Sequence, residues 1–300
     1  MKKIPLFGAL ALAIILACSP FGVPSQPGQP GLETIVAATM QGLLPTQAQQ
    51  NPPPAETPAA PLPAFSGTPL QFANLSLTIP PGLAVGGSGA QIPPASGDNV
   101  EPWGVTPGHT ELTFTGYALP DRFHEPKIYV YPAQGFAALN NGAAESILRL
   151  QTVLADPNAP LSEDNIPFVP FFNAGAVFTA QAKAIPFQNG VGVRMLTQYA
   201  QSFAQVNNHE LFYHFQGLTH DGQTYIIVIL PASAPFLAAN GEAPAQADGI
   251  PFPGYEDPNA DFGAYYQQIT ARLDATPPDT FSPSLTLLDA LISSLSIAAP

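Results

Sequence analysis

Residues 211–231 place the tightest constraint on what this chain can fold into. Their second half, residues 225–230, is apolar at every position. In the first half, Leu211, Tyr213 and Phe215 alternate with Phe212, His214 and Gln216. The turn-forming residues 219–222 between the halves predict a β-hairpin, in which His214 faces Ile229. Because a strand that is apolar on both faces needs a covering layer on each face, the sequence predicts a central strand of a layered α+β domain.

Further apolar patterns predict an antiparallel β-sheet, a meander in its core, covered by helices. Asn189-Gly190 is a dipeptide typical of two-residue hairpin turns. Asp257-Pro258 and Ser282-Pro283 each combine an N-cap residue with proline at the first helical position, so helices are expected to begin there. The expected strands are 72–79, 111–117, 127–131, 176–185, 191–199, 210–217 and 223–230, with a closing edge strand at 296–298, a helix at 142–155 and a Gly- and Pro-rich loop at 82–108.

The N-terminus has the pattern of a bacterial signal peptide. Lys2 and Lys3 precede an apolar run, residues 4–17, that is shorter than the roughly 20 residues needed to span a bilayer. The run ends in Leu16-Ala17-Cys18, which resembles the lipobox, where the cysteine is lipidated and becomes the mature N-terminus. Cys18 is the chain's one cysteine, so it cannot form an intrachain disulfide. We expect a lipid-anchored protein whose partner is the membrane, on the outer, extracytoplasmic face of the cell membrane.

Composition divides the remaining chain into a tether and a folded part. Residues 19–68 are rich in Pro, Gln, Ala and Gly, which is typical of a disordered linker. The net charge is −13, and no Lys or Arg stands between Cys18 and Arg122. Nucleic-acid binding requires clustered cations, so we expect no nucleic-acid partner. The expected organisation is a lipoprotein signal peptide over 1–18, a Pro-rich tether over 19–68 and one α+β domain over 69–300.

Two motifs come close to known chemical signatures. Residues 86–90, Gly-Gly-Ser-Gly-Ala, differ from the G-x-S-x-G elbow at the last position, and we expect a flexible loop there. Residues 257–263 imitate a calcium loop, but the glycine is one place late and Gln268 stands where a bidentate Glu belongs, so helix capping is the expected role. The five histidines form no ligand pair of known spacing. We expect no metal, no cofactor and no catalytic residue.

Topology suggests where a binding site lies. In a meander, the tight turns at 188–190 and 219–222 share one end of the sheet, so the connections 156–175, 201–209 and 231–257 share the other. Aromatic rings beside polar groups are typical of a ligand or partner surface, although the same rings would also fasten these loops to the core. The candidate binding surface comprises Phe168, Phe171, Phe172, Phe203, Asn207, His209, Phe236 and Tyr255.

The order of the segments IYVYPAQGF, LTQYAQ, LFYHFQGLTHDGQTYIIVILP and SLTLLDALISSLSI resembles that of uncharacterised bacterial lipoproteins. More distantly, residues 70–300 are similar to the PsbP-like α/β/α sandwich. This resemblance implies a fold and a binding or assembly module. The sequence therefore predicts a non-enzymatic module for an unknown protein or small-molecule partner. The alternative is an exported hydrolase with a His and carboxylate site at the loop-bearing end of the sheet.

Overall fold

The computed structural model describes residues 65–298, except Pro157, Ala159, Glu163, Pro170, Phe171, Phe172 and Ala247. The expected signal peptide, the lipidation site Cys18 and nearly all of the expected tether lie outside the described residues. The described residues belong to one compact unit, Leu62–Pro300.

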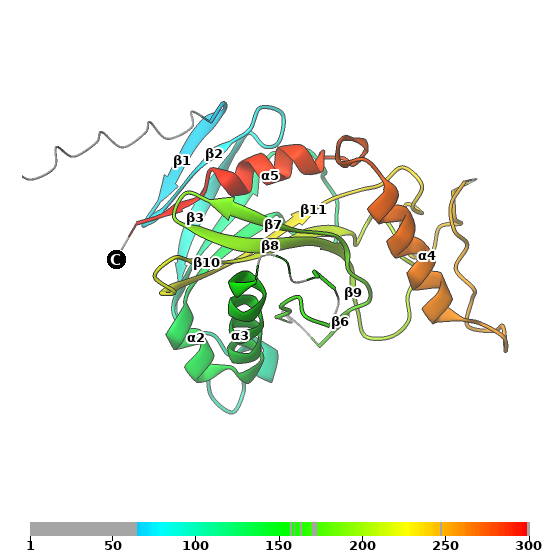
Figure 1. The fold of residues 1–300 in the computed structure, drawn as a ribbon, viewed down its shortest axis with the longest axis horizontal. Coiled ribbons are helices and arrows are strands. Elements are labelled where there is room, and N and C mark those ends of the chain that lie inside the picture. Colours follow the sequence, from blue (N-terminus) through cyan, green and yellow to red (C-terminus); the bar gives the residue numbers. More distant parts are fainter. Residues whose placement is uncertain are drawn as a thin grey trace, which may run out of the picture. The chain divides into compact units, whose positions relative to one another are not determined.

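Twelve strands and four α-helices make up the described part of the chain (Figure 1). The strands are β1 (Thr68–Phe72), β2 (Leu75–Ile79), β3 (Gly86–Ile92), β4 (His109–Thr115), β5 (Lys127–Pro132), β6 (Gly175–Ala176), β7 (Ala180–Phe187), β8 (Gly190–Thr197), β9 (Tyr199–Ala200), β10 (Phe212–Thr219), β11 (Thr224–Pro231) and β12 (Ser296–Ile297). The helices are α2 (Ala133–Leu139), α3 (Asn141–Ala155), α4 (Phe262–Ala275) and α5 (Leu285–Ser293). None of these helices is both long enough and apolar enough to cross a membrane.

The hairpin predicted from residues 211–231 is confirmed as β10 and β11, in the middle of an antiparallel seven-stranded sheet. The strand order is β3-β4-β5-β11-β10-β8-β7. The register pairs His214 with Ile229, as predicted. Strands β7, β8, β10 and β11 are consecutive neighbours, so the predicted meander is also confirmed. A second meander, β3-β4-β5, completes the sheet because β5 pairs with β11.

Both faces of β11 are covered, which confirms the predicted α+β architecture. Ile226, Val228 and Leu230 pack in one core cluster with residues of α4, α5 and the small β1-β2-β12 sheet. Tyr225 and Ile227, on the opposite face, pack in a second cluster with α2 and α3. Figure 1 shows α3 and α5 on opposite sides of the sheet. Each fully buried Ile or Leu side chain contributes about 1.5–3 kcal/mol relative to an exposed one, so this strand anchors both layers.

The prediction of one strand over residues 72–79 is wrong, and so is that of a loop at 86–90. Phe72 of β1 pairs with Leu75 of β2 across a tight turn, in which Ala73 adopts a φ of 51°. The glycine-rich stretch is strand β3, paired with β4 along its whole length. A Cβ at Gly89 would overlap the ring of Phe72, so the glycine permits close packing of β1 on β3. This stretch therefore forms neither a flexible loop nor a nucleophile elbow.

The last two helices begin later than predicted. The N-cap of α4 is Asp261, whose Oδ1 accepts from the Ala264 N–H at 2.8 Å, while the Asp257 side chain closes a local turn onto the Asn259 N–H. The N-cap of α5 is Ser284. Ser282 cannot serve as that cap because its backbone pairs with Ser233 in an extended bridge. The predicted closing strand at the C-terminus is confirmed as β12.

Candidate functional site

The two ends of the meander differ as predicted. The β7–β8 and β10–β11 turns lie side by side, since the His220 N–H donates to the Asn189 carbonyl at 2.9 Å. Gln188 and Asn189 occupy the first turn, because Phe187 pairs with Gly190, so the turn falls one residue before the predicted Asn-Gly. At the opposite end, loop 201–209 joins loop 231–257 through a bridge between Asn207 and Ala238. We call these the turn end and the loop end.

Two asparagines fix the backbone of the loop end. Asn207 is buried, and its Oδ1 accepts from the N–H groups of His209 and Glu210 at 3.0 and 3.2 Å. The Asn208 amide donates to the carbonyls of Ala234 and Leu237 at 3.0 and 3.2 Å. Buried backbone groups need such partners. Asn207 therefore shapes the loop from inside.

Helix α4 fastens loop 201–209 with two neighbouring tyrosines. The Tyr265 hydroxyl accepts from the Val206 N–H at 2.9 Å, and the Tyr266 hydroxyl accepts from the Ala204 N–H at 2.7 Å. Burial raises the pKa of Tyr265 to about 12, so its hydroxyl stays protonated at neutral pH. The loop is thus held at a fixed position against the first turns of the helix.

An aromatic cluster forms where these elements meet, and its members are Phe203, Phe252, Tyr255, Phe262 and Tyr266. The Phe203 ring stacks on Phe262 with centroids 4.5 Å apart and an interplanar angle of 7°. The Tyr255 hydroxyl donates to the Phe203 carbonyl and holds the two loops together. Phe203 and Tyr255 nevertheless remain 53% and 65% exposed. Rings in this environment offer apolar area to a ligand.

A shallow apolar groove adjoins the aromatic cluster and has a volume of about 400 Å³. Its walls come from the β6–β9 ribbon and from α4. A Cβ added at Gly175 would meet no atom within 4 Å, which shows how open this wall is. The lining residues are Gly175, Ala176, Val177, Ala200, Gln201, Ser202, Phe203 and Tyr266.

The structure brings only part of the predicted binding surface together. Phe203 and Tyr255 belong to the aromatic cluster. Phe236, in contrast, is 4% exposed, and Arg272 Cζ lies over its ring, 4.1 Å from the ring centroid. Phe168 is half-buried and packs edge-on against Tyr199. Asn207 is buried, and His209 Nδ1 lies 3.2 Å from the Asp121 carbonyl oxygen. Phe171 and Phe172 lie outside the described residues.

Sequence reasoning missed Phe262 and Tyr266 as surface residues. Apolar residues four positions apart, as these two are, fall on one side of a helix and would be expected to face the core. Both are only half-buried in the structure.

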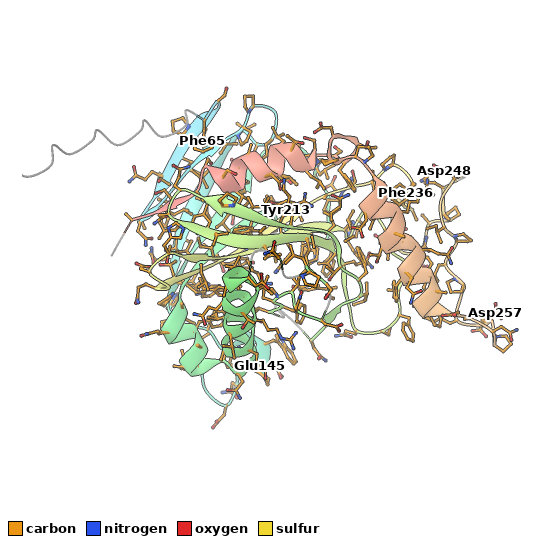
Figure 2. All side chains as sticks on the ribbon, viewed as in Figure 1. Phe65, Glu145, Tyr213, Phe236, Asp248 and Asp257 are labelled. Carbon is orange, nitrogen blue, oxygen red and sulfur yellow. The ribbon has the colours of Figure 1, made fainter. Side chains whose placement is uncertain are left out.

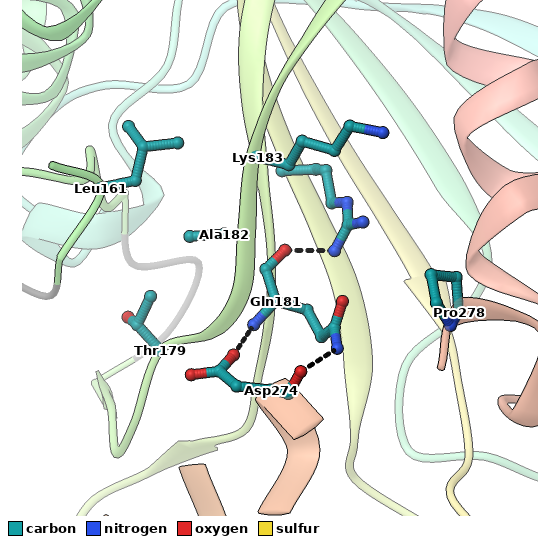
Figure 3. A pocket seen from close by; sticks show the side chains of 8 residues that line it. Leu161, Thr179, Gln181, Ala182, Lys183, Asp274 and Pro278 are labelled. Atoms are coloured by element: carbon teal, nitrogen blue, oxygen red, sulfur yellow. Dashed lines mark hydrogen bonds between the residues drawn. The ribbon is translucent and has the colours of Figure 1, made fainter. Parts of the chain in front are cut away.

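A second hollow, of about 450 Å³, lies between β7 and the end of α4 (Figure 3). Its polar groups form hydrogen bonds with the C-terminal end of α4. The Gln181 amide donates to the carbonyls of Leu273, Asp274 and Thr276, and the Gln181 N–H donates to the Asp274 carboxylate. These bonds satisfy carbonyls that a helix C-terminus leaves without intrahelical partners. The hollow therefore marks a C-cap.

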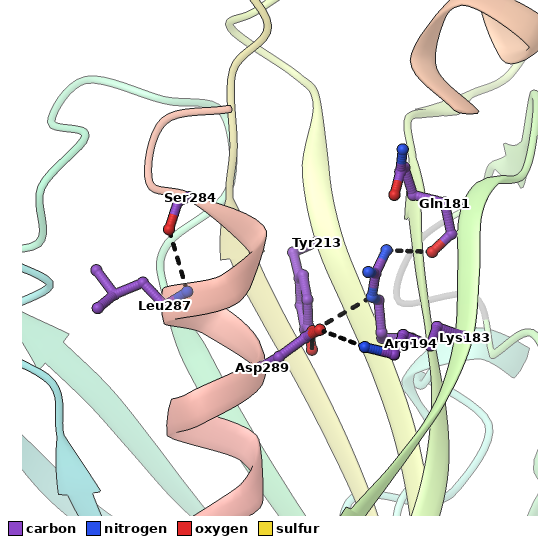
Figure 4. A network of polar contacts seen from close by, with 7 residues as sticks. All are labelled: Gln181, Lys183, Arg194, Tyr213, Ser284, Leu287 and Asp289. Atoms are coloured by element: carbon purple, nitrogen blue, oxygen red, sulfur yellow. Dashed lines mark hydrogen bonds and ion pairs between the residues drawn. The ribbon is translucent and has the colours of Figure 1, made fainter. Parts of the chain in front are cut away.

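A buried ionic network fastens α5 to the sheet (Figure 4). The Asp289 carboxylate lies 3.2 Å from Arg194 Nε and 3.5 Å from Lys183 Nζ, and it accepts from the Tyr213 hydroxyl at 3.0 Å. Arg194 is 3% exposed and also donates to the Gln181 carbonyl. Burial raises the pKa of Tyr213, which keeps its hydroxyl a donor. Each charge in this network has a partner, so we assign it to stability.

Two histidines near the loop end are neutral at neutral pH. His214 is 1% exposed, and neither of its ring nitrogens has a hydrogen-bond partner. Burial lowers the pKa of His214 to about 3, and burial together with His209 lowers the pKa of His124 to about 4. An imidazole with so low a pKa is a weak base, and a general base works best near the operating pH.

In the described part of the chain, no three His, Cys, Asp or Glu side chains gather closely enough to hold an ion. Of the helix capping expected for residues 257–263, Asp261 provides it for α4, whereas Asp257 closes a local turn outside the helix. No protein-family model, curated protein or solved structure matches the chain.

Proposed function

We propose that this chain is a non-enzymatic binding or assembly module, anchored by lipid on the outer face of a bacterial cell membrane. Its ligand would bind at the aromatic cluster and the adjoining groove. The observation that carries this proposal is the exposed Phe203 ring, stacked on Phe262 beside an apolar groove. Burying two exposed rings and a groove of this kind gives a hydrophobic driving force for association.

Preorganisation supports the same proposal. Tyr266 bonds the backbone next to Phe203, and Tyr255 bonds the Phe203 carbonyl. Ordering a side chain at an interface costs about 0.5–1.5 kcal/mol, and a ring that is already held avoids part of this cost. The rings are therefore suited to binding a partner without rearrangement.

Membrane attachment rests on the sequence, because Cys18 lies outside the described residues. The charged start, the short apolar run and the lone cysteine fit a lipoprotein, and the Pro-rich residues 19–68 fit a tether. We propose the PsbP-like α/β/α sandwich as the finer description of the fold. Its support is the antiparallel sheet with helices on both faces.

Site-specific photocrosslinking in native cells tests the binding site. We would replace Phe203 with p-benzoylphenylalanine in the full-length chain and use Phe123, which is 55% exposed, as the matched control. We expect a discrete crosslinked product from position 203 that is absent from position 123 and weakens in a Tyr255→Ala background. Identical crosslinking at both positions would overturn the proposal.

Fractionation of a Cys18→Ala variant tests the anchor separately. We expect the unaltered chain in the membrane fraction with the mass of an acylated N-terminus, and the variant without that added mass. Membrane retention of a variant that lacks acylation, at the level of the unaltered chain, would contradict lipid anchoring.

A further inference from the structure

The stretch of chain that carries the aromatic cluster has charges of one sign. Residues 195–271 contain seven carboxylates and no Lys or Arg. The next cation in the chain, Arg272, is already paired, since its Nη2 lies 2.8 Å from Asp248 Oδ2. The seven carboxylates belong to Glu210, Asp221, Glu242, Asp248, Glu256, Asp257 and Asp261.

Three of these carboxylates are close to the rings in the sequence. Glu256 and Asp257 directly follow Tyr255, and Asp261 directly precedes Phe262. All three acidic side chains are exposed. Figure 2 shows Asp257 beyond the start of α4, at the opposite end of the helix from Asp248 and Phe236. We call these three exposed carboxylates the acidic rim; they belong to a chain whose net charge is −13.

Exposed rings with an acidic rim match one ligand chemistry. A guanidinium or ammonium group is attracted both to the face of an aromatic ring and to a carboxylate. The small, apolar residues of the groove, such as Ala176 and Ala200, leave room for an apolar side chain next to that cation. An anionic lipid surface or a nucleic acid would instead meet repulsion at Glu256, Asp257 and Asp261.

We infer that the aromatic cluster binds a peptide segment of a partner protein in which Arg or Lys side chains alternate with apolar ones. The cation lies on the exposed rings of Phe203 and Tyr255, within reach of the acidic rim, and an apolar neighbour enters the groove. This inference rests on the proposed binding function and adds the class of ligand. Charge complementarity and the exposed rings carry it together.

Fluorescence anisotropy with defined peptides tests the ligand class. The purified full-length chain in detergent is titrated with fluorescein-labelled Leu-Arg-Leu-Arg-Leu-Arg, with the same peptide carrying citrulline in place of Arg, and with one carrying Glu. Citrulline keeps the size of Arg but removes its charge. We expect the Arg peptide to bind about tenfold more tightly than the citrulline peptide and to weaken as salt rises. The Glu peptide should bind least.

Matched variants locate the binding. Tyr255→Ala and Phe203→Ala should each weaken the Arg peptide roughly fivefold, whereas Phe123→Ala should not. The double variant Glu256→Gln/Asp257→Asn should weaken it, whereas Glu145→Gln, an exposed carboxylate on α3, should not. Circular dichroism on every variant would show that it folds.

Three results would overturn the inference. These are equal binding of the Arg and citrulline peptides, no binding of the Arg peptide, and binding that both ring variants leave unchanged. If crosslinking at position 203 persists alongside any of them, the binding function stands and the ligand class is wrong. If crosslinking at position 203 also fails, the binding function itself is wrong.

Discussion

The turn end and the loop end of the same meander differ in how closely their residues pack. At the turn end, glycines at 190, 192 and 217 allow backbone and phenyl rings to approach so closely that an added Cβ would overlap Phe187, Phe215 or a neighbouring carbonyl. At the loop end, the chain leaves the sheet in long connections and places the rings of Phe203 and Tyr255 in solvent. Tight packing stabilises the first end, and the second end keeps apolar area available.

This contrast teaches where a meander can carry function. Turns of two to four residues have no length to build a surface, whereas loops of many residues can be fastened by side chains and still expose others. The difference predicts that equivalent substitutions at the two ends have unequal effects on stability.

The largest effect is expected for Gly192→Ala at the turn end. Its Cβ would overlap the Gln216 carbonyl oxygen and the Gly217 Cα, which are backbone atoms that cannot move aside. We expect a loss of roughly 3 kcal/mol in the free energy of unfolding, measured by urea denaturation. Gly175→Ala at the loop end is the control, with an expected change below about 0.5 kcal/mol. Equal losses in the two variants would contradict the contrast.

Between the two ends, Asp289 of α5 pairs with Arg194 of β8 and so links the helix to the sheet. Asp289→Ala would leave the buried Arg194 without its counter-charge, so we expect a loss of about 3 kcal/mol in the free energy of unfolding. Lys183→Ala removes the exposed partner of the same carboxylate and should cost less than about 0.5 kcal/mol. Urea denaturation of the two variants compares them. Similar losses would show that the buried pair does not govern this contact.

Acid should weaken the chain through His214, near the loop end. Its pKa is about 3 when folded against an ordinary value of 6.5, so the unfolded chain binds a proton that the folded chain excludes. The contribution of neutral His214 to the free energy of unfolding is therefore full above pH 6.5 and is lost as the pH falls toward 3. When the pH is lowered from 7 to 4.5, the free energy of unfolding of His214→Leu should fall by about 2 kcal/mol less than that of the unaltered chain.

Urea denaturation at both pH values measures this difference, and His220→Gln, which alters an exposed histidine of the turn end, is the control. An unchanged pH dependence in His214→Leu would show that the buried imidazole is not responsible for the loss.

The smallest effect concerns the fastening of the loop end. Tyr266→Phe removes the hydroxyl that accepts from the Ala204 N–H, with an expected loss of about 1 kcal/mol. Hydrogen exchange at the Ala204 amide should accelerate, whereas exchange in β10 should change little. Gln267→Ala, an exposed neighbour on α4, is the control. Unaltered protection of Ala204 would contradict the proposed fastening.

The strands with strong local patterns were predictable, and so was the division of the sheet into two ends. The hairpin at 211–231, the meander and the closing strand all follow from apolar runs and turn residues. Errors arose where a local signal had a competitor. Asp257 caps a turn rather than α4, and Gly89 serves close packing under Phe72 rather than flexibility. Helix α2 was not predicted, since the expected helix covered residues 142–155 alone.

The candidate site was only partly predictable. Phe203 and Tyr255 were expected at the loop end, but sequence spacing could not tell their exposed rings from the buried Phe236. That distinction depends on which face of a loop meets α4, and loops have no side-chain period to reveal it.

By itself, the sequence determined the central hairpin, because six consecutive apolar residues are stable only between two covering layers. It also determined that residues 195–271 carry carboxylates and no Lys or Arg, since charge is a property of composition. Only the tertiary structure decided that β5 lies beside β11 and that Phe203 stacks on Phe262. These contacts join segments far apart in the chain, and the packing of the whole core, rather than any local pattern, sets their geometry.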